Sequence, residues 1–157
     1  MLAAMPILKF LHILSMFSAV GVVVGTEVLL HRVARSGDVR AMRTAFALAK
    51  PMNVVAPALF LIGVALGVID GLTRGFDLFA PWLLIAYGLF LTMFVLGGAV
   101  QGRWIDRMVA AVASAGDEPP SPELERVIND RVATAAMYLS WLLLAGIIFT
   151  MVIKPFS

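Results

Sequence analysis

Four long apolar stretches alternate with short polar segments along this chain. The stretches are Ile7–Leu30, Val54–Ile69, Trp82–Val100 and Ala135–Ile153. About 20 helical residues cross a hydrocarbon layer of about 30 Å, and the stretches reach that length, the second with help from its flanking residues. Because lipid offers no hydrogen-bond partners, the spans must be helices, and no period-two alternation indicates a barrel. The pattern predicts an all-α, four-helix transmembrane bundle with up-down-up-down topology.

We expect residues 1–157 to form a single integral membrane domain, with spans at about 7–30, 51–71, 81–101 and 133–153. Between the first two spans, Val39–Lys50 predicts a short amphipathic cytoplasmic helix that lies along the membrane interface. Its apolar face comprises Val39, Met42, Phe46 and Ala49. Ser121 and Pro122 are typical of a helix start, and we expect that helix to run unbroken through Arg131 into the fourth span.

Composition agrees with a membrane protein. Hydrophobic residues make up 61% of the chain and charged residues 14%, against about 45–50% and about 25% in an average soluble domain. The absence of cysteine excludes disulfides, thiolate catalysis and cysteine-ligated metals. The net charge of +2 is too small to indicate nucleic-acid binding. Ile7–Leu30 is too long for the apolar core of a removable signal, so we expect it to be a permanent span.

Lysine and arginine are unevenly distributed outside the spans. Of the 12 in the chain, five lie in the first connector and four in the third. The other three, Lys9, Arg74 and Lys154, lie near the termini or in the second connector. Because basic residues concentrate in cytoplasmic loops, this asymmetry predicts a cytoplasmic (inner) membrane protein with both termini outside.

Glycines mark the expected packing faces of the helices. Gly63, Gly67 and Gly71 follow one another at four-residue spacing in the second span, and Gly21 and Gly25 share a face of the first. Small residues at this spacing let helix backbones approach closely in lipid. We therefore expect close contacts at these faces, and besides the lipid bilayer we expect a homo-oligomer or a membrane protein complex as partner.

Four ionisable residues, His12, Glu27, His31 and Asp70, lie within the spans or at their ends. Such residues are costly in lipid and count as site hypotheses by default. His12 lies inside the external edge, where a neutral imidazole has two alternatives: it ligates haem iron or a metal, or it hydrogen-bonds a neighbouring helix. His31 cannot join it at one site, because about 28 Å of helix separates them.

Glu27 and His31 are one helical turn apart, which predicts an interfacial salt bridge, with a proton relay as the alternative. Asp70 ends the second span, where it is solvated or meets Arg74. The chain has no nucleophile–base arrangement, phosphate loop or His-x-x-x-His motif, so neither catalytic residues nor metal ligands are predicted.

As a whole, the chain resembles a bacterial family of predicted integral membrane proteins called domain of unknown function 2269. The resemblance covers almost the whole chain and rests on four short motifs. They are Leu8-Lys9-Phe10-Leu11-His12, Arg35-Ser36-Gly37-Asp38, Ala80-Pro81-Trp82 and Lys154-Pro155. This resemblance supports the membrane fold but brings no established activity.

A more distant resemblance is to HemJ-type protoporphyrinogen oxidases and CopD-like copper-resistance proteins. Lys9 and His12 match the Lys-x-x-His that opens the first span of HemJ-type proteins, and His31 falls near their second histidine. The resemblance implies haem b binding with His12 as a ligand. Ala86 stands where those proteins have a lysine, so the oxidase reaction is not implied.

The leading hypothesis from the sequence is a multi-pass membrane protein with a non-enzymatic accessory or assembly role, because glycine packing faces dominate over polar chemistry. The alternative is a haem b-binding redox protein with His12 as axial ligand. Met93, Tyr87 or His12 of a second copy would then complete the coordination. A third hypothesis is a transporter of a small solute or copper. The sequence shows no broken-helix site of the kind that transporters use.

Overall fold

The computed structural model describes residues 4–116 and 120–155, and this part of the chain is helical without strands, as predicted. The elements are α1 (Ala4–Arg35), α2 (Val39–Ala49), α3 (Met52–Thr73), α4 (Pro81–Leu96), the π-helix η1 (Gly97–Gly102), α5 (Arg103–Ser114), α6 (Pro122–Ile128) and α7 (Arg131–Ile153). Among the described residues, four segments are long and apolar enough to cross a membrane. They are Pro6–Arg35, Val39–Thr73, Pro81–Ser114 and Pro122–Ile153.

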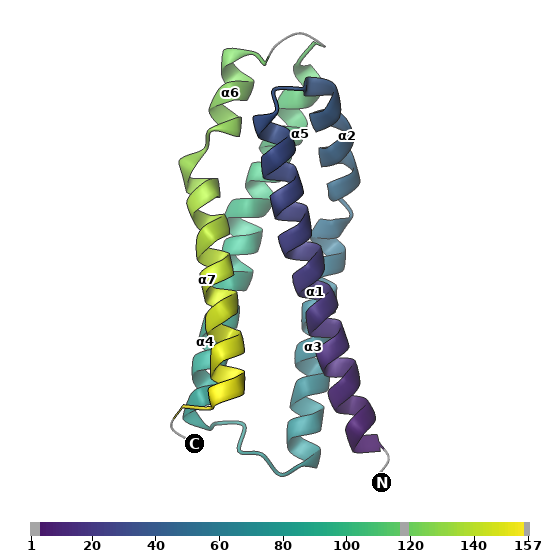
Figure 1. Cartoon of the computed structure of the whole chain (residues 1–157), viewed down its shortest axis with the longest axis vertical. Coiled ribbons are helices and arrows are strands. Elements are labelled where there is room, and N and C mark those ends of the chain that lie inside the picture. Colours follow the sequence, from purple (N-terminus) through teal and green to yellow (C-terminus); the bar gives the residue numbers. More distant parts are fainter. Residues whose placement is uncertain (1–3, 117–119, 156–157) are drawn as a thin grey trace.

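The long helices run up and down side by side, which confirms the predicted four-helix bundle (Figure 1). α1 packs on α3, and α4 packs on α7, so the bundle consists of two hairpin-like pairs. One end of the bundle, called here the terminal end, carries the start of α1, the end of α7 and the α3–α4 loop (Figure 1). The opposite end, called here the cap, consists of α2, α5, α6 and the last turns of α1.

The larger buried core of the described residues lies in the cap. The largest fully buried side chains all gather there: Trp104, Phe46, Leu30, Met42, Met108, Leu124 and Val112. At 1.5 Å per residue, the 32 residues of α1 extend about 48 Å, which exceeds a hydrocarbon layer of about 30 Å. Part of α1 therefore lies outside the lipid, and the arginines of its last turn, Arg32 and Arg35, indicate that this part is its end, which supplies one wall of the core.

The amphipathic helix α2 forms where the sequence predicted it, but its expected position was wrong. Asp38 caps its first turn by accepting a hydrogen bond from the backbone N–H of Ala41 at 2.9 Å. The predicted apolar face is buried against α1 and α5, so protein side chains cover it and it is not free to enter the membrane interface.

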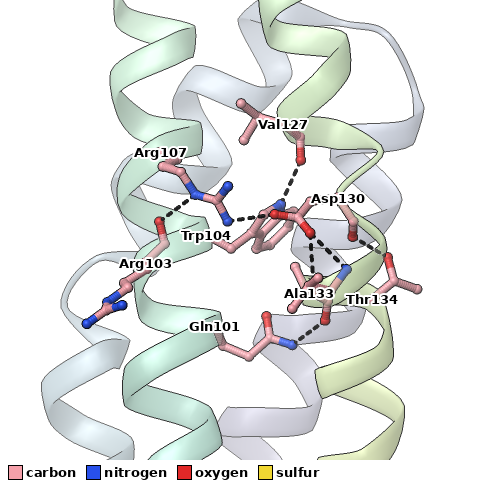
Figure 2. A network of polar contacts seen from close by, with 9 residues as sticks. Gln101, Arg103, Trp104, Arg107, Val127, Asp130, Ala133 and Thr134 are labelled. Atoms are coloured by element: carbon pink, nitrogen blue, oxygen red, sulfur yellow. Dashed lines mark hydrogen bonds and ion pairs between the residues drawn. The ribbon is translucent and has the colours of Figure 1, made fainter.

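The last helix does not run unbroken into the fourth span. α6 ends at Ile128, and Asp130 starts α7 by accepting hydrogen bonds from the backbone N–H groups of Val132 and Ala133. Asp130 also binds the Arg107 guanidinium at 2.6 Å (Figure 2). The predicted continuity was wrong because the Asp130 side chain offers these N–H groups a cap, as acidic N-cap residues do.

Polar side chains from η1 and α5 reach the same junction (Figure 2). The buried Gln101 amide donates to the Ala133 carbonyl at 2.8 Å, and the Trp104 indole donates to the Val127 carbonyl at 2.9 Å. Gln101 lies in the π-helix, a form of helix that is often found at functional positions. The two bonds fix the third span against the start of the fourth.

The core of the membrane half is smaller and includes Ala19, Phe60, Met93 and Ile147. Here α1 and α3 approach closely at the predicted glycines. A Cβ atom on Gly63 would lie 2.6 Å from Met16 Sδ, and one on Gly67 would lie 2.7 Å from His12 Cε1. By contrast, Gly21 and Gly25 are exposed, and a Cβ on either would meet nothing within 4 Å. The glycine face of α3 therefore packs within the chain, whereas that of α1 faces outward.

We predict that Gly67→Leu lowers thermal stability in detergent, by about 1–3 kcal/mol, because the added side chain forces α1 away from α3. Gly88→Leu is the matched control, since a Cβ on Gly88 would meet nothing within 4 Å. Melting of the two purified variants is compared with that of wild type. Equal melting temperatures for all three proteins would contradict the close α1–α3 contact.

Candidate functional site

A cavity of about 560 Å³ opens at the terminal end, between the α1–α3 pair and the α4–α7 pair. We call it the terminal-end cavity. Its walls are mainly apolar and aromatic, with Trp82, Tyr87 and Phe90 contributed by α4. A volume of this size, with few polar groups among apolar walls, is typical of a small-molecule site.

His12 lies on the α1 wall of this cavity. Its Nδ1 is 2.6 Å from the carbonyl oxygen of Gly63. A carbonyl can only accept a hydrogen bond, so Nδ1 carries the proton and donates it, and Nε2 of the neutral ring keeps its lone pair. One turn along, the Ser15 hydroxyl donates to the Leu59 carbonyl at 2.7 Å. Two side-chain donors of α1 thus bind two carbonyls of α3 and fix the imidazole ring.

The orientation of His12 is the one that metal-binding histidines commonly have. Such a histidine donates its second ring N–H to a backbone carbonyl or carboxylate, which fixes the tautomer and leaves the other nitrogen to coordinate. The sequence left open whether His12 is a ligand or hydrogen-bonds a neighbouring helix. The structure shows the hydrogen bond, and this bond also leaves Nε2 able to coordinate.

The residues considered as a second ligand are not equally placed. Tyr87 lines the terminal-end cavity, as His12 does, and belongs to α4. Met93 belongs to the apolar cluster of the membrane half and is absent from the cavity walls. Ala86, which stands where the HemJ-type resemblance has a lysine, is buried and lines the same cavity.

Basic side chains surround the cavity at the terminal end, namely Lys9, Arg74 and Lys154. Arg74 pairs with Asp70 at 2.9 Å, one of the two alternatives expected for Asp70. The Lys154 ammonium lies 5.2 Å from the centre of the Phe76 ring and 5.3 Å from that of Trp82, within the range of cation–π contacts. This basic rim was not predicted, because its members are far apart in the sequence.

The expected salt bridge between Glu27 and His31 does not form. His31 Nδ1 lies 3.1 Å from the backbone carbonyl of Glu27, and its ring stacks on Trp104 in the cap core, with centroids 4.4 Å apart. The Glu27 carboxylate accepts a hydrogen bond from the Trp141 indole of α7 at 2.8 Å instead. These partners could not be predicted from the helical spacing, because tertiary packing brings the two tryptophans to α1.

Comparison with known proteins identifies the family and no closer relative. No curated protein and no solved structure matches the chain. A family model described as "Predicted integral membrane protein (DUF2269)" matches residues 6–155, which covers all four candidate spans. The chain therefore belongs to the DUF2269 family of predicted integral membrane proteins.

Proposed function

We propose that this protein is a single integral membrane domain that binds haem b in the terminal-end cavity, with His12 Nε2 as an axial ligand. The observation that carries the proposal is the hydrogen bond from His12 Nδ1 to the Gly63 carbonyl in the wall of a 560 Å³ cavity. Histidines that coordinate a metal commonly donate their other ring N–H to a backbone carbonyl in this way. The HemJ-type resemblance, which also points to His12, supports the same reading.

The other groups around the cavity fit a porphyrin. Its apolar macrocycle would contact the walls that include Trp82 and Phe90, and its propionates would meet Lys9 and Lys154 at the rim. Tyr87 is the candidate second ligand within the chain, since tyrosinate is a known haem ligand. These assignments replace Met93, which is not part of the cavity walls.

Bound haem would supply one-electron exchange at iron, and the chain's part is to bind and orient it. His12 would hold the iron, and Gly67 leaves room for the imidazole ring next to α3. Ala86 stands where HemJ-type proteins have a lysine, so the resemblance supports haem binding and not the oxidase reaction.

We predict that wild type, purified after expression with added haem, shows a Soret band that His12→Ala lacks. External imidazole is expected to restore part of the band, because it places a free ligand in the space that the substitution opens. His31→Gln is the control, since His31 lies in the cap, and it is expected to keep the band. A colourless wild type, or an unchanged band in His12→Ala, would remove His12 from the ligand role.

We further propose that the protein resides in the inner membrane with the cap in the cytoplasm and both termini outside. The support is the charge asymmetry, because the two basic connectors form the cap. Tags placed at the C-terminus are expected to react with impermeant reagents in intact cells. A tag at Gly37, in the cap turn, serves as the protected control, and the reverse labelling pattern would contradict this orientation.

A second candidate function is the accessory or assembly role, and one observation favours it. Gly21 and Gly25 form an exposed small-residue face on α1 that no part of the described chain covers. Close helix pairing in lipid uses such faces. We therefore propose a homo-oligomer or a membrane complex that contacts α1 through this face.

The assembly proposal predicts that Gly21→Leu combined with Gly25→Leu reduces the oligomer population in detergent without lowering the melting temperature of the monomer. Mass photometry at matched protein concentrations measures the first quantity. Gly88→Leu provides the control for a leucine added to another exposed helix face. If the double variant assembles as wild type does, this face contacts lipid only.

A further inference from the structure

A second cavity, of about 500 Å³, lies at the junction of the membrane half with the cap. We call it the cap-side cavity. It is separate from the terminal-end cavity and shares no lining residue with it. Apolar side chains and glycines form most of its surface, including Val23, Pro57 and Gly97. The π-helix η1 forms part of one wall, and α1 with α3 forms the other.

Glu27 is the acidic residue that this cavity holds at the level of the spans. It lies within α1, eight residues or about 12 Å before the helix ends at Arg35. Its Oε2 atom accepts the Trp141 indole N–H at 2.8 Å, while Oε1 has no hydrogen-bond partner among the described residues. No ion pair of Glu27 is found in the described chain either. Glu27 is half-buried, and its second carboxylate oxygen therefore remains available to a ligand in the cavity.

The other charged residues of the cap-side cavity lie towards the cap. Lys50, Arg103 and Asp106 line it with exposed side chains, which water hydrates and salt screens. At equal distance, an interaction at an effective dielectric of about 20 is about fourfold stronger than in bulk water. Glu27 therefore dominates the electrostatics of the apolar interior, despite the two basic groups nearer the cap.

The remaining walls suit an organic cation better than a metal ion. No group of three or more histidine, aspartate or glutamate side chains that could hold a metal is found in the described chain. Hard metal cations need six or more oxygen ligands, whereas an alkylammonium or phosphonium ion needs one counter-charge and apolar contacts. Trp104 also lines this cavity, where it adds apolar surface only, because its ring is buried and stacks on His31.

We propose that the cap-side cavity binds a monovalent organic cation with apolar substituents, and that Glu27 is its counter-ion. The bond from Trp141 then has a positioning role: it holds one carboxylate oxygen and leaves the other to face the ligand. The apolar lining contacts the substituents. This proposal does not depend on haem, because it concerns a different cavity and a different residue.

Tetraphenylphosphonium is the probe, used in equilibrium binding to the purified full-length protein in a neutral detergent. Wild type is expected to bind it saturably. Glu27→Gln keeps an oxygen for the Trp141 bond but removes the charge, and is expected to bind at least about tenfold more weakly, a factor that corresponds to about 1.4 kcal/mol. Glu123→Gln removes an equal charge from the exposed surface of α6 and is expected to bind as wild type does.

Tetraphenylborate has the same shape and the opposite charge, and it is measured separately as a control for apolar binding. Any binding of this anion is expected to be no weaker in Glu27→Gln than in wild type, because Glu27 repels it and the basic rim of the terminal-end cavity attracts it. No saturable phosphonium binding, equal phosphonium binding by wild type and Glu27→Gln, or an equal loss of binding of both ions in Glu27→Gln would each overturn the proposal. If Glu27→Gln melts below the assay temperature, Glu27→Asp takes its place: it keeps the charge and is expected to retain saturable binding, and loss of binding by a folded Glu27→Asp would also overturn the proposal.

Discussion

The structure depends on one constraint: inside a bilayer, a polar group finds its partner in the protein or finds none. Each polar side chain that joins the spans meets this constraint with a bond to another helix. Ser15 and His12 bind carbonyls of α3, Gln101 binds a carbonyl of α7, and Glu27 accepts from Trp141. These bonds set which helices are neighbours. They also account for the glycines of α3, because the imidazole ring of His12 needs Gly67 to come this close.

The two cavities differ in the polar groups that lie among their apolar walls. At the terminal end, an imidazole lies among apolar walls with a basic rim, which suits an anionic and coordinating ligand. At the cap side, a carboxylate lies among apolar walls, which suits a cation. The apolar cluster around Ala19, Phe60, Met93 and Ile147 belongs to the membrane half, and none of these four except Ile147 lines either cavity.

The apolar pattern was enough to predict the fold, because lipid allows only helices and closed barrels, the pattern lacks the alternation of a barrel, and the span lengths follow from the thickness of the lipid. The glycine spacing predicted a close helix contact at α3 but did not identify α1 as the partner, and it could not distinguish Gly63, which packs, from Gly21, which does not. The position of α2 could not be predicted, since it depends on how far α1 and α5 project. The partners of Glu27 and the basic rim of the terminal-end cavity needed the tertiary structure, because they join residues that lie far apart in the chain.

The largest fully buried side chains lie in the cap, and this has a consequence for how the molecule comes apart. Apolar burial from water stabilises the cap, whereas helices in lipid associate through close packing and interhelical hydrogen bonds without that driving force. Urea weakens burial from water, so it acts first on the cap, while a change of detergent acts on the spans. The two ends of α1 therefore belong to regions held together by different forces, and a single melting temperature averages over both.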